Sequence, residues 1–307
     1  MQGAKTSRGA VVITGAFSYT GKYATRLLLN RGYNVRTLTY HPERAHPFGD
    51  KVQVFPYNFG DPDQLTQSLL GASTLINTYW VRFPRGRSTF ETAVQNTRTL
   101  IRAAKNAGVK RIVHVSIANP SLESNLGYYK GKAHLEQAVV ESGLSYTILR
   151  PTVIFGPEDI LINNIAWFVR RFPAFGIPGD GRYRIRPIYV EDMARLIADA
   201  VEREENAVLD AVGPETYTFE ELVRQIAAQL RRRTRLVHLP MPVAYVSTLD
   251  RLVRWRCCPH VGGIQGSYGQ PVGPRGTIHR GNLFEPMAGS KSRANRHEVC
   301  VRGSAPL

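Results

Sequence analysis

Three residues near the middle of the chain could together move a proton at a carbon-bound oxygen. Tyr128 and Lys132 are four positions apart, so on a helix they share one face. Ser116 ends an apolar run twelve residues before Tyr128. A phenol is a poor acid–base catalyst at its ordinary pKa of about 10, but a nearby ammonium favours the phenolate and lowers that pKa. The set predicts proton exchange by Tyr128, tuning by Lys132 and orientation of the reacting oxygen by Ser116. The alternative is a surface helix with a solvated lysine.

The segment GAFSYTGK at 15–22 is the second candidate for chemistry, because it could bind a phosphate. Its glycines are Gly15 and Gly21, with Ser18 where a third glycine often stands. Backbone N–H groups at the start of a helix face such an anion, and the helix dipole favours its charge. An ordinary strand-to-helix turn is the alternative. If the loop does bind a cofactor, further contacts are expected from Phe17, Tyr19 and Thr20.

The elements that must position these residues alternate along the first 150 residues. Short β-branched runs predict strands at 10–14, 34–39, 52–58, 73–79, 111–116 and 145–154. Apolar residues three and four apart predict helices at 20–32, 61–71, 88–108 and 128–143, and Gly32, Gly71, Gly108 and Gly143 occupy C-terminal cap positions. Strand–helix alternation with short loops predicts an α/β fold with a doubly wound parallel sheet.

The pattern loosens after about residue 155 and indicates a smaller α+β lobe, built partly on the edge of the sheet. Helices are predicted at 159–171, 191–201 and 219–230, and strands at 182–190 and 207–213. Thr218 and Glu221 form a capping box before the last of these helices.

The end of the second predicted strand, TLTYHPER, bears on the choice of dinucleotide. A carboxylate there would grip the ribose 2′-hydroxyl of NAD, and none occurs before Glu43. Thr39, His41 and Arg44 could instead accommodate the 2′-phosphate of NADP, which the sequence slightly favours. Arg44 could also be a solvated loop residue.

Together, GAFSYTG, Ser116, the Tyr128/Lys132 pair and LRPTVIFGP at 149–157 resemble the extended and atypical short-chain dehydrogenases/reductases, especially the NAD(P)-dependent epimerase/dehydratase and NmrA-like groups. The resemblance covers residues 10 to about 250. It implies a Rossmann fold in 1–155 that binds NAD(P), and a substrate lobe in 156–254 that is partly interleaved with this core. It also implies cofactor contacts by Asn58, Phe59, Thr78, Tyr79, Pro151 and Val153.

The sequence departs from the family pattern at two places. Ser18 replaces the middle glycine, as it does in atypical members. The fourth predicted strand ends in NTYW, where the family usually has small residues, so Tyr79 and Trp80 crowd the usual approach of substrate. Tyr129 is out of register with Lys132, which leaves Tyr128 as the predicted acid–base residue.

Two groups of arginines are candidates for substrate binding. Arg82 and Arg85 belong to the loop after the fourth strand, and Arg184 lies on the strand predicted at 182–190, where Arg182, Arg184 and Arg186 would share one face. Plain exposed charge is the alternative. His114, inside a strand, is expected to be structural, and no spacing of His, Asp or Glu suggests a metal.

Composition restricts the classes of protein that fit. The net charge is +16, yet no basic helix, aromatic–basic module or zinc-finger spacing accompanies it, so nucleic-acid binding is not expected. All three cysteines lie after residue 255, which excludes thiol catalysis in the body. Without an apolar run of bilayer length or a signal h-region, a cytoplasmic protein is expected.

The sequence at 255–307 differs in composition from the rest of the chain. It has no apolar periodicity and is rich in Gly, Cys and Arg. One interpretation is a disordered basic tail. The other is a single-base slip near Trp255. Residues 255–307 can be back-translated into codons that, when read one base later, give a sequence with helical apolar spacing that resembles the end of family members. Resequencing of the gene tests this hypothesis.

The sequence thus predicts an NAD(P)-dependent oxidoreductase or epimerase that transfers hydride between nicotinamide and a carbonyl or carbinol carbon. A nucleotide-sugar is one candidate among small-molecule substrates, and a homodimer is one candidate assembly. The alternative is a non-catalytic NmrA-like protein that senses dinucleotides or assists assembly, which the crowding by Tyr79 and Trp80 favours.

Overall fold

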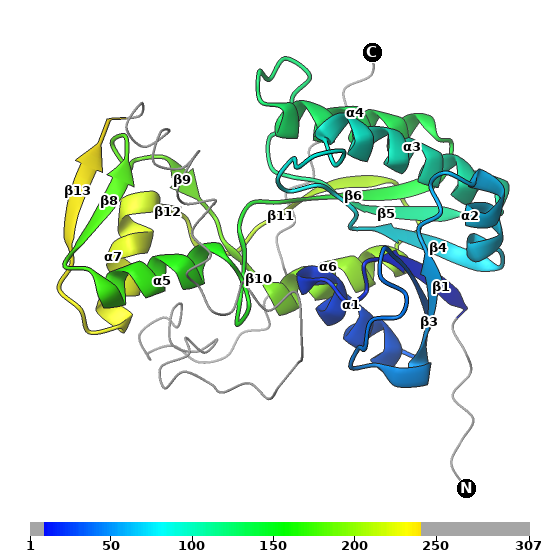
Figure 1. Cartoon of the computed structure of the whole chain (residues 1–307), viewed down its shortest axis with the longest axis horizontal. Helices are drawn as coiled ribbons and strands as arrows, with labels where there is room; N and C mark the ends of the chain where they lie inside the picture. Colours follow the sequence, from blue (N-terminus) through cyan, green and yellow to red (C-terminus); the bar gives the residue numbers. More distant parts are fainter. Residues whose placement is uncertain (1–8, 241–307) are drawn as a thin grey trace, which may run out of the picture. The chain divides into compact units, whose positions relative to one another are not determined.

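The computed structural model describes residues 9–240, and these form two compact units (Figure 1). The first contains residues 9–154 and 188–212, and the second contains residues 155–187 and 213–240. The segment at 255–307, with its cysteines and the proposed frame slip, lies outside the described residues.

The first unit is built on a seven-stranded parallel sheet. Its order is β11-β6-β5-β4-β1-β2-β3, and neighbouring strands run parallel. The strands are β1 (Ala10–Thr14), β2 (Asn34–Thr39), β3 (Val52–Pro56), β4 (Ala72–Asn77), β5 (Arg111–Val115), β6 (Ser145–Pro151) and β11 (Ala207–Ala211). The chain winds in opposite directions from β1, toward β2 on one side and β4 on the other. In such sheets ligands bind outside the carboxyl ends of the strands at this switch point.

Helices cover both faces of this sheet (Figure 1). One face carries α1 (Tyr19–Asn30) and α6 (Val190–Glu202), and the other carries α2 (Pro62–Leu69), α3 (Phe90–Asn106) and α4 (Gly127–Glu141). The strand β1 shows why both faces are apolar. Val11 and Ile13 join the core on the α1 side and Val12 joins the core on the α3 side, because successive side chains of a strand point to opposite faces. A short 3₁₀ turn, η1 (Gly49–Lys51), precedes β3.

The predicted doubly wound sheet is therefore confirmed. All six strands expected in the first 150 residues are present, shorter by up to three residues at their carboxyl ends, and β11 adds a seventh at the edge. The glycines expected at helix ends also behave as predicted: Gly32 has φ +85° and Gly143 has φ +76°, a backbone conformation in which any other residue is strained.

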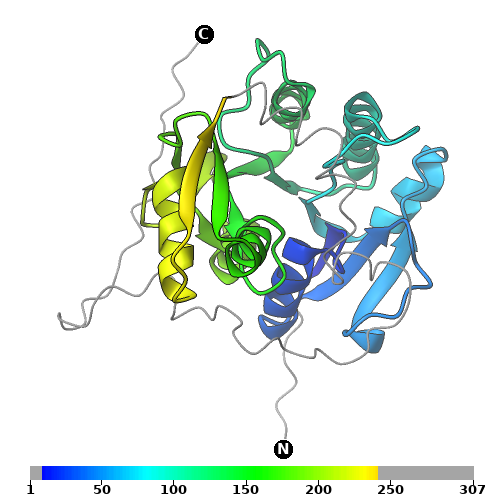
Figure 2. The same ribbon diagram turned by 60° about the vertical axis from the view of Figure 1, so that its left-hand side comes forward.

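The second unit has its own core. It contains α5 (Leu161–Arg171), β8 (Ala174–Pro178), β9 (Arg184–Ile185), β12 (Tyr217–Thr218), α7 (Phe219–Gln229) and β13 (Arg235–Leu239). The strands β13 and β8 pair in parallel and β12 pairs with β9 antiparallel; Figure 2 shows β13 in yellow beside β8 in green. Apolar residues of α5 and α7 pack together, including Ile165 and Leu222. Two short strands, β7 (Ile154–Phe155) and β10 (Ile188–Tyr189), lie where the chain passes between the units.

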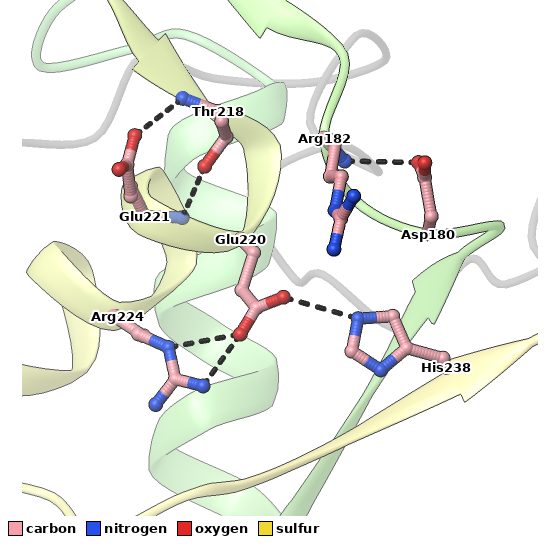
Figure 3. Close-up of polar contacts among 7 residues, drawn as sticks. All are labelled: Asp180, Arg182, Thr218, Glu220, Glu221, Arg224 and His238. Atoms are coloured by element: carbon pink, nitrogen blue, oxygen red, sulfur yellow. Dashed lines mark hydrogen bonds and ion pairs between the residues drawn. The ribbon is translucent and has the colours of Figure 1, made fainter.

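Figure 3 shows the polar contacts around the start of α7. The predicted capping box is present: the Glu221 N–H donates to Thr218 Oγ1 over 3.1 Å, and the Thr218 N–H donates to Glu221 Oε2 over 2.7 Å. Glu220 accepts from Arg224 over 2.5 Å and lies 3.0 Å from His238 Nε2.

One predicted element is wrong. The strand expected at 182–190 is broken into β9 and β10, because Pro187 has no N–H to give to a ladder. Arg182, Arg184 and Arg186 therefore do not share a strand face. The Arg182 N–H donates to Asp180 Oδ1 over 3.0 Å in a turn (Figure 3), and the Arg186 side chain donates to the Gly213 carbonyl over 3.0 Å.

Candidate functional site

The loop between β1 and α1 is a tight turn that only glycine can complete at two positions. Gly15 has φ +69°, and a Cβ on Gly21 would lie 2.0 Å from the Gly15 carbonyl oxygen. Ser18 is the N-cap of α1, where its hydroxyl accepts from the Gly21 N–H over 3.2 Å. The serine that replaces the family's middle glycine thus orders the first turn of the helix. The loop has the close helix–strand approach that a phosphate-binding turn requires.

A pocket of about 330 Å³ opens at the switch point, over the carboxyl ends of β1, β2 and β4. Of the residues predicted to bind the cofactor, the structure brings together Gly15, Phe17, Ser18, Thr39, His41, Arg44, Thr78 and Tyr79 in its wall. No carboxylate lines it among the described residues. The size and place of the pocket fit part of a dinucleotide, and its glycine-bounded floor lets backbone approach a ligand closely.

The other predicted cofactor residues do not line this pocket. Tyr19, Thr20 and Gly21 form the first turn of α1, Pro151 ends β6, and Val153 follows it. Asn58 gives its side-chain amide to Gln64 Oε1 over 2.6 Å. Phe59 stacks on Tyr57, a wall residue, with ring centroids 4.9 Å apart, so it supports the pocket from behind.

Two tyrosines of the wall, Tyr40 and Tyr57, were not predicted from the sequence. The hydroxyls of Tyr40 and Tyr79 lie 3.1 Å apart, and the Asn96 amide donates to Tyr79 Oη over 3.0 Å. Burial raises the pKa of Tyr40 and of Tyr57 above the ordinary value, so both phenols stay neutral near pH 7. Their signal in the sequence was an aromatic residue at the carboxyl end of each predicted strand.

A hydrogen-bonded network fixes the strand ends beneath the pocket. The Thr14 hydroxyl accepts from the N–H groups of Thr78, over 2.7 Å, and of Tyr79, over 2.9 Å. The Asn77 amide lies 3.1 Å from Nδ1 of His114, which is buried. Burial and then the charge of Lys132 hold the pKa of His114 well below its usual range, so this imidazole is neutral. These contacts agree with a structural role for His114.

Ser116, Tyr128 and Lys132 all belong to the first unit, with Ser116 directly after β5 and the other two on α4. Lys132 is only 3% exposed and donates to the Val115 carbonyl over 2.8 Å. Burial lowers its pKa to about 7, although the charge of Glu136 opposes the shift. Burial raises the pKa of Tyr128 and the charge of Arg82 opposes that rise. Ser116 Oγ is buried and has no hydrogen-bond partner among the described residues.

Trp80, one of the two bulky residues of NTYW, packs against Phe90, Tyr128 and Lys132. Its indole stacks on Phe90 with centroids 5.7 Å apart and meets the Tyr128 ring edge-on at 5.5 Å. Lys132 Nζ lies 4.7 Å from its centroid. Within the part of the chain that the structure describes, no hydrogen bond joins Ser116, Tyr128 and Lys132 to one another.

The predicted substrate arginines are divided between the two units. Arg82 and Arg85 are exposed on the loop after β4, where the backbones of Arg85 and Ser88 exchange hydrogen bonds of 2.9 and 3.0 Å. Arg184 belongs to the second unit, where its charge lowers the pKa of Glu221, behind the larger effect of the Thr218 hydrogen bonds. Residues 9–240 hold no group of three side chains suited to a metal and no helix long and apolar enough to cross a bilayer.

A parallel sheet with a glycine-bounded loop and a pocket at its switch point defines a Rossmann-type dinucleotide-binding protein. The family model described as NAD(P)H-binding matches residues 15–161. Ceramide reductase of Caulobacter vibrioides is 30% identical over 246 residues, which cover 78% of this chain and 76% of the reductase. The chain belongs to the NAD(P)-binding extended and atypical short-chain dehydrogenase/reductase family.

The chain is also similar to a mitochondrial protein and to a solved structure. The mitochondrial NADH dehydrogenase [ubiquinone] 1 alpha subcomplex subunit 9 of Arabidopsis thaliana is 28% identical over 262 residues, which cover 81% of this chain and 65% of that subunit. The solved structure of MoeE5 in complex with UDP-glucose and NAD has a TM-score of 0.64 at 22% identity, covering 76% of this chain and 85% of MoeE5. This last likeness concerns the fold.

Proposed function

We propose that this protein binds a nicotinamide dinucleotide in the switch-point pocket and oxidises or reduces a carbon–oxygen group of a small molecule with it. The observation that carries the proposal is Trp80: it lines the pocket and also contacts Tyr128 and Lys132. The pocket and the proton-transfer residues are therefore neighbours in one unit. The NAD(P)H-binding family model and the similarity to ceramide reductase support this function.

Each residue of the set has a part in this reaction. The dinucleotide supplies or accepts the hydride when it is bound. Tyr128 Oη exchanges the proton with the substrate oxygen, and the charge of Arg82 eases its ionisation against the effect of burial. Ser116 Oγ has no other partner among the described residues and is free to hydrogen-bond that oxygen. Lys132 titrates near neutrality and favours the phenolate when it is protonated.

The pocket favours NADP over NAD in this proposal. Arg44, His41 and Thr39 lie in its wall at the end of β2. Among residues 9–240, no Asp or Glu lines this wall. A 2′-phosphate beside Arg44 would gain a charge-assisted hydrogen bond. Nucleotide-sugars stay among the candidate substrates because MoeE5 binds UDP-glucose. A homodimer, a cytoplasmic location and the absence of nucleic-acid binding stay predictions.

A second function deserves a test because Trp80 covers Lys132. A protein that binds dinucleotide without turnover would need the pocket and not the proton-transfer set. The similarity to a subunit of NADH dehydrogenase, a multi-subunit assembly by its name, agrees with this alternative.

Replacement of Tyr128 by phenylalanine separates the two functions. We expect Tyr128→Phe to bind NADPH as the wild type does, measured by calorimetry, and to lose about 10²-fold or more in turnover across a panel of aldehydes, ketones and nucleotide-sugars. Arg87→Gln, on the exposed loop, is the matched control. NADPH binding with no turnover by the wild type would favour the non-catalytic function, and no binding of NADPH or NADH would contradict both.

A further inference from the structure

Trp80 occupies the place where the dinucleotide pocket meets the proton-transfer residues. It lies three residues after the end of β4, and it lines the pocket together with Thr78 and Tyr79. The same ring lies against Tyr128 and above the ammonium of Lys132. With the ring in this place, Lys132 is 3% exposed and its amine contacts the Val115 carbonyl. Lys132 therefore faces the indole and not the space of the pocket.

The Trp80 indole packs against Gly131 of α4 and against Phe90 of α3, and this position of the ring is called its seat. A Cβ on Gly131 would lie 2.7 Å from Cη2 of Trp80, which is closer than real Cβ atoms come. Gly131 stands one residue before Lys132, so the absence of a side chain there lets the ring cover the amine. On the other side Phe90 stacks on the ring at an interplanar angle of 8°. The seat depends on residues of three elements: the end of β4, α3 and α4.

The forces that hold the ring in this seat oppose one another. The Lys132 ammonium lies over the indole face, where the ring attracts a cation. The stacked contact with Phe90 and the edge-on contact with Tyr128 also favour this position. The indole N–H, however, is buried without a hydrogen-bond partner among the described residues, which opposes it. Displacement of the ring would let water reach this N–H, which offsets part of the cost of leaving these contacts.

We propose that Trp80 is a gate residue that must leave its seat on Gly131 before Lys132 can reach a dinucleotide in the pocket. The inference rests on the proposed function, because it concerns the same pocket. In the seated state the ring separates the amine from the ligand space, and the displaced state connects them. Apparent affinity for the dinucleotide then equals the intrinsic affinity multiplied by the fraction of open molecules.

Other charged groups around Lys132 are accounted for in this proposal. Glu136 lies on the same helix and is held by Arg150 of β6 through a 2.5 Å ion pair. Burial, and then the charge of Lys132, lower the pKa of His114 of β5, which is neutral in its buried place. Tyr128, one turn earlier, is also neutral near pH 7 because burial raises its pKa. The variants of Trp80 keep all of these groups in the chain, and of the three only Tyr128 packs against the ring.

Three variants and one control test the gate. Trp80→Ala removes the ring, and Gly131→Ala displaces it while keeping it in the chain. Trp80→Phe fills the seat with a smaller ring. Phe83→Ala is the matched control, because it removes an aromatic ring of the same loop that is 65% exposed. Each variant is first checked for folding by circular dichroism and thermal unfolding.

Two measurements are made on the full-length protein. NADPH and NADH affinities are measured by calorimetry, and we expect Trp80→Ala and Gly131→Ala to bind about tenfold tighter, the factor for a gate closed in about nine of ten molecules. The rate of acetylation of Lys132, followed by mass spectrometry against pH, gives its midpoint. We expect this midpoint to rise from about 7 toward the ordinary lysine value in both variants, because water replaces the ring. Trp80→Phe and Phe83→Ala should stay close to the wild type.

The outcomes separate the gate from the proposed function. Binding by the wild type with equal or weaker binding by both Trp80→Ala and Gly131→Ala overturns the gate alone and makes Trp80 a wall of the site. An acetylation midpoint that does not move in either variant also overturns it. Binding by Trp80→Ala where the wild type binds nothing supports the gate strongly. No binding by any of the five proteins overturns both the gate and the proposed function.

Discussion

At the scale of single residues, the site keeps polar atoms buried without partners, which is costly unless function requires them. Ser116 Oγ and the Trp80 indole N–H are both buried and unpartnered among residues 9–240. Each such group costs about 1–3 kcal/mol. Ser116 follows Val115, whose carbonyl accepts a hydrogen bond from Lys132. The Trp80 ring lies over the Lys132 amine. A bound ligand that accepts or donates a hydrogen bond there would explain these two unsatisfied groups.

Arg44 gives the sharpest test of cofactor choice at this scale. We expect Arg44→Gln to weaken NADPH binding about tenfold and to leave NADH binding unchanged, because only NADPH carries the 2′-phosphate that a guanidinium would hold. The measurement is calorimetric titration with both dinucleotides. Arg85→Gln, on the exposed loop after β4, is the control. An equal loss for both cofactors would place Arg44 at a phosphate they share, and no loss would remove it from the site.

The sequence predicts a site residue when its role depends on nearby residues in the chain. It does not when the role depends on packing between distant segments. The turn at Gly15, Ser18 and Gly21 was predictable, because a turn between strand and helix needs small or capping residues at set positions. Tyr40 and Tyr57 were missed, since an aromatic residue in a strand is as typical of core as of a pocket wall. The seat of Trp80 on Gly131 could not be predicted, because it depends on the packing of α4 beside the end of β4.

At the scale of elements, the sequence predicts those strands and helices that local periodicity defines, and it does not predict pairings between distant segments. Strands and helices of the first 150 residues have clear periodicities and glycine caps, so their order was predictable and their ends were known within about three residues. The strand expected at 182–190 is absent as a single element, because Pro187 interrupts a ladder even though the arginines before it alternate. The pairing of β13 with β8 joins segments far apart in the sequence, and no local pattern indicates it.

The turn between β1 and α1 is the element whose geometry a single methyl group should break. We expect Gly21→Ala to destabilise the protein by about 1–3 kcal/mol and to abolish detectable dinucleotide binding, because the new Cβ would lie 2.0 Å from the Gly15 carbonyl oxygen. Urea unfolding and calorimetric titration measure the two effects. Gly60→Ala is the control, since no atom lies within 4 Å of a Cβ there. Normal binding by Gly21→Ala would mean that the first turn of α1 does not approach the ligand.

At the scale of the whole molecule, buried titratable groups set how stability depends on pH. Lys132 has a pKa of about 7 when folded and about 10.4 when unfolded. Between these values the unfolded chain binds a proton that the folded chain lacks, so stability rises with pH. Tyr57 acts in the opposite direction above about pH 10, because the unfolded phenol loses its proton while the buried one keeps it. Stability should therefore be greatest on the alkaline side, between pH 9 and 10 as a rough estimate.

The contribution of Lys132 can be isolated by comparison with Lys132→Met. The free energy of unfolding of the variant, minus that of the wild type, should be largest below pH 7 and should shrink by up to about 1.4 kcal/mol per pH unit between pH 7 and 10, since only the wild type gains stability there. Urea unfolding at pH 6, 8 and 9.5 measures this difference, and other titrating groups cancel from it. Lys110→Met, on the turn before β5, serves as the control for loss of a lysine charge elsewhere. A constant difference across this range would show that Lys132 keeps an ordinary pKa in the folded protein, and would mean that Trp80 does not shield it from water.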